Sequence, residues 1–302
     1  EGIAPSFTFV STVNAFILRG AQPVFIDIRP DTLNINENLI EEMITPHTRA
    51  IYVVHYAGVA CELDKIMEIA NKHNLPVIED NAHGLFGKYN GRLLGTFGQM
   101  ACQSFHETKN ISCGEGGVLL INVDDLIERA EIIREKGTDR SKFFRGQIDK
   151  YSWVDVGSSY LPSEIIAALL YSQLKDANLI QKKRRSLWDR YDRSLKDWAF
   201  KNGVVLPTVP AHCEQSYHMY YLLLPSLDER HRFIQYLKKE NINSAFHYVP
   251  LHTSTMGKRY GYREGDLPVT ENMSERLVRL PFFFDLDESS QSRVISTMTR
   301  FK

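Results

Sequence analysis

The first half of the chain alternates short apolar runs with amphipathic stretches, and this alternation constrains the fold more than any other feature. The predicted strands cover residues 23–28, 49–58, 75–80, 99–106 and 116–122. The predicted helices cover 36–44, with Asn36 as a possible cap, 62–74, and 124–137, with Gly137 at its end. This order favours crossover connections and a largely parallel sheet flanked by helices. We therefore expect a large α/β domain.

The second half predicts a smaller unit of a different kind. Its expected elements are a polar and aromatic loop, a long helical region, a strand, a helix and a strand, over residues 140–160, 162–200, 218–225, 228–242 and 244–252. Such a series suggests a small α+β domain. We divide the chain into a large domain over 1–182 and a connecting helix with a small C-terminal domain over 183–302.

The composition excludes several classes of protein. The chain has 302 residues and a formal net charge of −1, which argues against a basic face for nucleic acid. No apolar run approaches the roughly 20 residues that span a membrane, and no signal-peptide pattern opens the sequence. The four cysteines lack metal-ligand spacing, so we expect reduced thiols in a cytoplasmic protein and no metal. The sequence enters a domain interior directly after Glu1, so we expect an N-terminal part to be missing.

Asp80 and Lys109 follow two of the predicted strands, at the sheet edge where open α/β sheets bind ligands. A lysine between buried strands is costly unless it is solvated or paired. Pyridoxal phosphate requires a lysine amine to bind its aldehyde and an acid beside its ring nitrogen. It also requires hydroxyls around its phosphate and a flat apolar cover, for which Ser104 and Phe9 are candidates.

Each of these residues alone also has an ordinary structural explanation. An aspartate after a strand is usually a turn or cap residue, and a lysine in a loop is usually a solvated charge. Ser104 and Phe9 fit a packed core equally well, and the glycines after Lys109 suit any tight turn. Spacing alone therefore leaves pyridoxal phosphate as one hypothesis among several.

Longer motifs, kept in order along nearly the whole chain, add a resemblance. They are PSFTFVSTVNAFILRGAQPVFIDI, VHYAGVACELD, VIEDNAHG, SFHETKNISCGEGG, ERAEIIREKGTDRSKFFRGQIDKYSWVDVGSSY, HYVPLH and RLPFF. In these segments the chain resembles the sugar aminotransferases of the DegT/DnrJ/EryC family. The resemblance implies the aspartate aminotransferase-like fold (fold type I) and pyridoxal 5'-phosphate as cofactor.

The same resemblance implies roles for the residues that match the motifs. Lys109 is then the lysine that binds the cofactor and shuttles the proton, and Asp80 is the partner of the ring nitrogen. His83 takes the place opposite the phenolic oxygen, Ser104 the place at the phosphate, and Phe9 the place of an aromatic residue stacked on the ring.

Further implied roles concern the partner subunit and the substrates. Many relatives supply an asparagine to the phosphate from the neighbouring subunit, where this chain has Ser159, so a homodimer is implied. The implied substrates are glutamate, as amino donor, and a dTDP-linked 4-keto-6-deoxy sugar, as acceptor. His247 and His252 are candidates for contacts with the sugar.

Two departures from the family keep other interpretations open. Asn81 stands where relatives have alanine, and the first phosphate-binding turn of the family would lie before Glu1. One alternative is a sugar dehydratase with the same fold and cofactor, although those enzymes carry a histidine where this chain has Lys109. Another is a truncated relative without cofactor that only dimerises.

Overall fold

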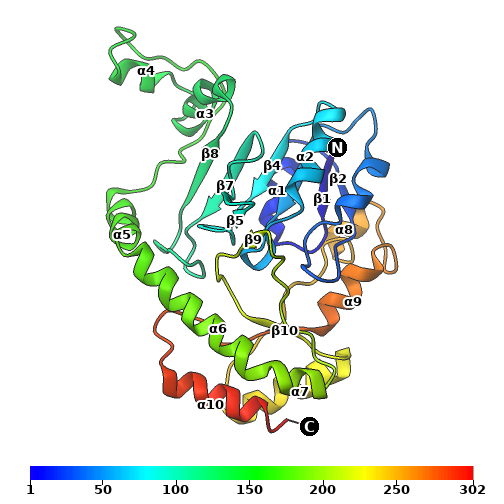
Figure 1. Ribbon diagram of the computed structural model, residues 1–302. Helices are drawn as coiled ribbons and strands as arrows, with labels where there is room; N and C mark the ends of the chain where they lie inside the picture. The colour runs from blue at the N-terminus through cyan, green and yellow to red at the C-terminus, as the bar shows by residue number, and fades with distance from the viewer. Residues whose placement is uncertain (302) are drawn as a thin grey trace.

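The protein is described here by a computed structural model of residues 1–301. Its centre is a six-stranded sheet with the order β2-β1-β3-β4-β7-β8 (Figure 1). The strands are β1 (Gly2–Pro5), β2 (Pro23–Ile26), β3 (Ala50–Val54), β4 (Val77–Asp80), β7 (Met100–Ser104) and β8 (Gly117–Ile121). Neighbours from β2 to β7 are parallel, and β8 is antiparallel to β7. The expected α/β fold with a mostly parallel sheet is confirmed.

The direction of β8 follows from its connection to β7. The connection covers residues 105–116, all of which the structure describes, and contains no helix. Parallel neighbours need a long crossover, whereas antiparallel neighbours can be joined by a direct return. Lys109 therefore lies in a loop that is held at both ends by adjacent strands.

Two helices lie between consecutive strands of this sheet. Helix α1 (Val10–Ile17) connects β1 to β2, and α2 (Leu63–Lys72) lies between β3 and β4. Helix α2 buries residues at helical spacing, among them Leu63, Ile66 and Ile69, which form one apolar face. This face shares a core with buried strand residues, including Ile3, Ile51, Val53 and Val77.

The single helix expected over 36–44 is wrong. The segment forms two three-residue 3₁₀ turns, η1 (Glu37–Leu39) and η2 (Glu41–Met43). Asn36 does cap the first turn, because its side chain accepts a hydrogen bond from the backbone N–H of Asn38 at 3.1 Å. Pro46 follows closely and disfavours helical backbone in the residue before it, which limits the length of any helix here.

Strand β4 ends in two consecutive carboxylates, Glu79 and Asp80. Glu79 is fully buried and accepts three hydrogen bonds of 2.7–2.8 Å from backbone N–H groups within residues 95–98. His55 Nε2 lies 2.9 Å from the same carboxylate. Burial opposes the charged form, but the bonds from His55 and the backbone outweigh it and lower the pKa of Glu79. Glu79 thus holds the next loop against the sheet.

The C-terminal part has a core of its own. Helices α6 (Ala177–Lys201), α7 (Leu227–Lys239) and α10 (Glu288–Met298) surround a two-stranded antiparallel sheet, β10 (Tyr221–Leu223) with β11 (Leu277–Arg279). Their shared core includes Trp188, Tyr191, Tyr220, Phe233 and Leu237. Helix α5 (Glu164–Lys175) precedes α6. The boundary at 182/183 falls inside the continuous helix α6, and our division into two domains stays a prediction.

The strand expected over 244–252 is wrong. Only an isolated bridge between Ala245 and Arg279 forms there. The backbone N–H of Leu251 donates instead to Ser6 O at 3.0 Å, so the segment is tied to the end of β1. Pro250 has no N–H to offer to a ladder, which also works against a strand.

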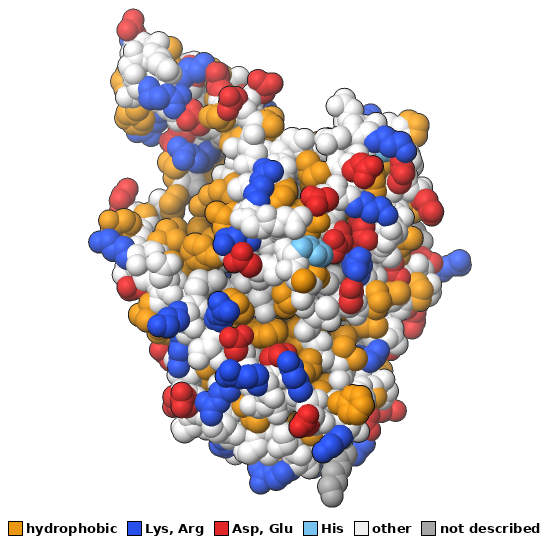
Figure 2. Space-filling model, in the orientation of Figure 1, with side chains coloured by type: hydrophobic (Ala, Val, Ile, Leu, Met, Phe, Trp, Pro, Cys, Tyr) orange, Lys and Arg blue, Asp and Glu red, His pale blue; other side chains and the backbone are white. Residues whose placement is uncertain are grey.

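Residues 124–160 form a projection, which we call the arm. It contains η4 (Asp124–Leu126), α3 (Ile127–Arg134) and α4 (Arg140–Phe144), the last in a segment expected to be a loop. The arm extends away from the central sheet in Figure 1 and is a separate lobe in Figure 2. Isolated bridges pair Glu135 with Ser159 and Thr138 with Trp153, and so hold its two sides together.

The remaining elements are short. They are η3 (Tyr56–Gly58), the three-stranded sheet of β5 (Lys88–Tyr89), β6 (Arg92–Leu93) and β9 (Cys213–Glu214), and helices α8 (Thr255–Arg259) and α9 (Pro268–Arg276). Within residues 1–301, no helix has the length and apolar character to cross a bilayer.

Candidate active site

Asp80 ends β4 at the carboxyl edge of the parallel sheet, and two donors orient its side chain. Thr12 Oγ1, from α1, donates to Asp80 Oδ2 at 2.6 Å. The backbone N–H of Ala82 donates to Asp80 Oδ1 at 3.1 Å. Thr8 Oγ1 lies 2.8 Å from Thr12 Oγ1 and extends the chain of hydroxyls. The first turn of α1 therefore fixes the carboxylate in one orientation.

The Lys109 amine is brought into the electrostatic reach of this carboxylate. Burial lowers the pKa of Lys109, the Asp80 carboxylate opposes that shift, and Arg279 adds to it. A lysine with a lowered pKa is more often neutral at physiological pH, and the neutral amine is the nucleophile. The backbone N–H of Lys109 donates to His106 O at 2.9 Å, which fixes the start of the loop.

Histidines form one wall of the site. His83 stacks on His218 with ring centroids 4.1 Å apart, and the His247 ring lies 6.1 Å from that of His83. Burial is the main cause that lowers the pKa of His83 and His218 well below its ordinary value. Burial, Arg279 and Lys109 lower that of His247 to about 2. The wall is therefore made of neutral imidazoles.

His247 and His252 occupy different surroundings. His247 Nδ1 lies 2.9 Å from the hydroxyl of Tyr56, beside the wall just described. His252 is fully buried, with Nδ1 2.7 Å from Ser6 Oγ and Nε2 2.8 Å from Glu271 Oε1. The structure places His247 with the site residues. Both ring nitrogens of His252 are already bonded, so a sugar would have to displace one of these partners.

The other expected contacts divide into two groups. Ser104 ends β7, and its Oγ accepts a hydrogen bond from the His106 backbone N–H at 3.3 Å. Phe9 caps α1 and is 57% exposed, with its ring 6.3 Å from that of Tyr248. Ser159 is exposed and forms an isolated bridge with Glu135 on the arm, which extends away from the central sheet (Figure 1). The fold of one chain thus gathers Phe9 and Ser104 near the sheet edge and leaves Ser159 apart.

Two buried polar atoms of the site have no hydrogen-bond partner within residues 1–301. The Nδ1 atom of His83 and the Nε atom of Arg279 are buried without a hydrogen bond. Buried polar atoms without partners are rare in folded chains, and a bound ligand is one way to satisfy them. Together with a lysine of lowered pKa and an oriented aspartate, these atoms fit a planar aldehyde cofactor with a ring nitrogen.

Sequence reasoning missed Thr12, Tyr56, His218 and Arg279. The family motifs given above include Thr12, Tyr56 and Arg279. A sequence motif does not show which of its side chains point toward the sheet edge. His218 precedes β10, and its contact with Asn110, at 3.0 Å from Nδ1 to Oδ1, joins parts of the chain that no local pattern connects.

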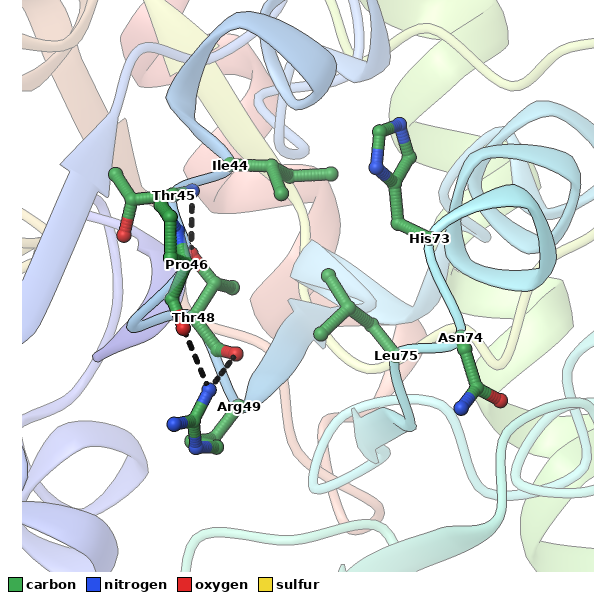
Figure 3. A pocket seen from close by; sticks show the side chains of 8 residues that line it. All are labelled: Ile44, Thr45, Pro46, Thr48, Arg49, His73, Asn74 and Leu75. Carbon is green, nitrogen blue, oxygen red and sulfur yellow. Dashed lines mark hydrogen bonds between the residues drawn. The ribbon is translucent and has the colours of Figure 1, made fainter.

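A separate hollow lies at the other edge of the sheet (Figure 3). Its volume is about 530 Å³, and its lining residues are Ile44, Thr45, Pro46, Thr48, Arg49, His73, Asn74 and Leu75. Arg49 and Leu75 directly precede β3 and the turn into β4, so the hollow faces the amino ends of these strands. The Arg49 guanidinium already donates to the carbonyls of Pro46 and Thr48, at 2.9 and 3.0 Å. We therefore propose no reaction in this hollow.

No group of three or more His, Cys, Asp or Glu side chains in residues 1–301 is arranged to hold a metal ion.

Comparisons with known proteins identify the family of the chain. The model of the DegT/DnrJ/EryC1/StrS aminotransferase family matches residues 1–299. The spore coat polysaccharide biosynthesis protein SpsC of Bacillus subtilis is 32% identical over 99% of this chain and 78% of its own length. The uncharacterized protein MJ1066 of Methanocaldococcus jannaschii is 35% identical over 99% and 79% of the two chains.

Solved structures give the same result. The aminotransferase TlmJ from Streptoalloteichus hindustanus is 29% identical, with a TM-score of 0.89 over 99% of this chain and 78% of its own. A putative sugar aminotransferase, Spr1654 from Streptococcus pneumoniae, was solved in its PMP-form; it is 25% identical, with a TM-score of 0.90 over 99% and 80% of the two chains. The chain belongs to the DegT/DnrJ/EryC1/StrS family and is a pyridoxal-phosphate-dependent sugar aminotransferase.

Proposed function

We propose that this aminotransferase moves the amino group of glutamate to the 4-keto carbon of dTDP-4-keto-6-deoxy-D-glucose, giving dTDP-4-amino-4,6-dideoxy-D-galactose. Three motifs support this choice, FVST.NAF.LRGA, REKGTDRS.FFRGQ.DKY.W.D.GSSYL and HY.PLH, which resemble the transaminase of that name in the enterobacterial common antigen pathway. The reaction would take place in the cytoplasm. The observation that carries the chemistry is the Lys109 amine of lowered pKa beside the Asp80 carboxylate.

Five residues of one chain would hold the cofactor. Lys109 would bind its aldehyde carbon, and Asp80 its ring nitrogen. His83 would face the phenolic oxygen through its free Nδ1 atom. Ser104 would donate to the phosphate, and the exposed ring of Phe9 would cover the flat face. When bound, pyridoxal phosphate draws electrons from the substrate carbon and so allows that carbon to lose a proton.

The chain's own contribution is to orient, to exclude water and to carry a proton. Asp80 stays in one orientation because Thr12 and the Ala82 N–H both donate to it. Lys109 Nζ would take the proton from the α-carbon of glutamate and later return one to the keto carbon of the sugar. Burial lowers the pKa of Lys109 and so moves it toward the working pH, the direction that favours a base.

We place the sugar beside His247. Its imidazole is neutral and can share hydrogen bonds with sugar hydroxyls while it stays 2.9 Å from the Tyr56 hydroxyl. The exposed cations Lys258 and Arg259 on α8 would meet the diphosphate of the nucleotide. We assign His252 a structural role, because its bonds to Ser6 and Glu271 hold in place the segment that carries His247.

We further propose a homodimer in which the arm reaches the partner subunit. The arm and the start of α5 expose many large apolar side chains, among them Phe144, Tyr151, Trp153, Tyr160 and Ile165. Figure 2 shows hydrophobic side chains on this lobe and on the surface below it. Exposed apolar patches of this kind mark interaction sites. We propose that a second copy of the chain buries this apolar surface, since Ser159 on the same arm would then reach the cofactor phosphate of the partner subunit.

A substrate panel tests the proposed reaction. Purified holoenzyme in its amine form is offered a series of 4-keto and 3-keto sugar nucleotides, with dTDP and UDP as the nucleotide. We expect the dTDP-linked 4-keto-6-deoxy sugar to be consumed fastest, with the galactose configuration at C4 of the product by NMR. A clear preference for a 3-keto or UDP-linked sugar would replace our substrate and leave the aminotransferase in place.

His247→Ala tests the placement of the sugar. The two half-reactions are measured separately by stopped flow. We expect the Michaelis constant for the nucleotide sugar to rise, with the glutamate half-reaction nearly unchanged, because the truncation weakens binding of one substrate. Equal damage to both would assign His247 to the cofactor or to the fold.

A further inference from the structure

Arg279 is the last residue of β11, and its backbone is fixed from two sides. In β11 it pairs with Tyr221 of β10. Its N–H donates to Ala245 O at 2.7 Å, and its carbonyl accepts from the Ala245 N–H at 3.3 Å. Ala245 lies two residues before His247, so Arg279 is held beside the segment that carries the histidine wall.

The Arg279 side chain has no partner within residues 1–301. No hydrogen bond or ion pair forms there, and its Nε atom is buried. Arg140 and Arg230 also bury an Nε atom without a partner, but each donates from its terminal nitrogens, to Glu135 and to Ser274 O. The more deeply buried Arg184 donates to the carbonyls of Tyr217 and His218. Arg279 has no such bond from any of its nitrogens within the described residues. A buried donor without a partner costs free energy, and the cost is larger for a charged group. Such a guanidinium calls for an anion.

The positive charge of Arg279 acts on the site. It lowers the pKa of Lys109, after the effects of burial and Asp80. It also contributes to the lowered pKa of His83 and His247, for which burial is the main cause. The imidazoles are neutral, and the oxygens of Asp80 are already bonded to Thr12 and Ala82. The positive charge of Arg279 therefore has no counter-ion among the side chains around Lys109 described above.

We propose that Arg279 binds the α-carboxylate of the amino donor. This proposal rests on the proposed function, because it assumes an amino acid as one of two substrates. Lys109 must reach the carbon that carries the amine, and in an amino acid that carbon also carries the carboxylate. The anion must then lie within a few bonds of Lys109, where Arg279 has its effect. The planar guanidinium offers a fork of N–H donors that matches two carboxylate oxygens.

Other anions fit this position less well. The diphosphate of a nucleotide sugar is separated from the 4-keto carbon by the sugar ring, so it lies far from the reacting carbon. The cofactor phosphate is assigned to Ser104 and to the arm. Arg279 would therefore serve the donor half of the reaction and stay without an anion in the acceptor half.

The test compares Arg279→Gln and Arg279→Lys with the wild type as holoenzymes. The matched control is Arg193→Gln, which removes one positive charge from an exposed position of α6. The half-reactions with glutamate and with the keto sugar nucleotide are followed separately by the cofactor spectrum. The glutamate reaction is repeated with 4-aminobutanoate, which lacks the α-carboxylate. Binding of 2-oxoglutarate to the aldehyde form, which has no amine to transfer to it, is measured by calorimetry.

We expect Arg279→Gln to weaken glutamate and 2-oxoglutarate binding by about 10- to 100-fold, the usual loss for one charge-assisted bond. Arg279→Lys should fall between this variant and the wild type, and Arg193→Gln should match the wild type. The sugar half-reaction and the rate with 4-aminobutanoate should change little. This pattern would support the assignment.

Three results would overturn it. If both Arg279 variants bind glutamate and 2-oxoglutarate as tightly as the wild type, Arg279 does not contact the α-carboxylate. Equal loss in both half-reactions, with weaker retention of the cofactor on dialysis, would assign Arg279 to the cofactor. A wild type that reacts with no amino acid would defeat the proposed function itself, and the assignment would fall with it.

Discussion

Thr12 and Asp80 lie 68 residues apart in the chain, and the threonine hydroxyl donates to the carboxylate at 2.6 Å. The bond joins the first turn of α1 to the end of β4. It makes α1 part of the active site, although Thr12 would not itself touch a substrate.

Thr12→Val should test this positioning role. The variant keeps the shape of the side chain but removes the donor, so we expect kcat to fall by roughly 10-fold or more, as for loss of a bond to a charged group. Thr12→Ser, which keeps the hydroxyl, should restore most of the rate. Equal rates in both variants would show that the Ala82 N–H alone orients the carboxylate.

Lys109→Ala should abolish turnover. We expect a fall of more than about 10³-fold, because the variant loses both the covalent attachment and the proton carrier. Circular dichroism and thermal unfolding should show an intact fold, since little core is removed. Lys88→Ala is the control; Lys88 pairs with Glu214 at 3.1 Å outside the site and should keep full activity. Near-native activity of Lys109→Ala would refute the assigned role.

The stability of the protein should fall in mild acid, and His247 should contribute. Its pKa is about 2 in the fold, against an ordinary value of 6.5. Between these values the unfolded chain binds a proton that the native site does not bind. The contribution of His247 to the free energy of unfolding is therefore fully present above about pH 6.5. It is lost as pH falls, by up to roughly 1.4 kcal/mol per pH unit.

His247→Asn should flatten this dependence. Denaturant unfolding at several pH values below about 6.5 measures it, as the difference in slope between the variant and the wild type. The titratable and charged groups around the imidazole are Tyr56, His83, Lys109, His218, Tyr248 and Arg279. Burial also lowers the pKa of His83 and His218, so these two titrate in the same direction and remain as background in both proteins. Parallel slopes in both proteins would show that the imidazole is protonated in the fold.

Trp153→Ser should weaken the proposed dimer. Trp153 is 78% exposed on the arm, and its ring would be buried against the partner. We expect the dissociation constant to rise by about 10-fold or more in analytical ultracentrifugation, since buried tryptophans are frequent energetic centres of interfaces. Phe200→Ser is the control, because Phe200 is 90% exposed on α6, away from the arm. A wild type that sediments as a monomer at micromolar concentration would refute the dimer.

The sequence predicted the parallel sheet because its strands depend on local patterns. It also predicted Asp80 and Lys109 at one edge of that sheet, and in the structure the Asp80 carboxylate acts electrostatically on the Lys109 amine. A strand followed by a polar residue places that residue at the ligand edge in any sheet of this class. The expected strand over 244–252 failed because its backbone donors are used by Ser6, almost 250 residues away, which no local pattern reveals. Arg279 was missed for a related reason, since an arginine shows its lack of a partner only after folding.

The two carboxylates that end β4 show how narrowly the site is specified. Val53 pairs with Glu79 and Val54 with Asp80, and successive side chains of a strand point to opposite faces. A slip of one residue in this register would turn Glu79 toward the cofactor and leave Asp80 for the N–H groups of residues 95–98. A glutamate is longer by one methylene, so it would overreach the place that Thr12 defines. The buried pair of Glu79 and His55 thus fixes the register of β4, and with it the position of the neighbouring Asp80.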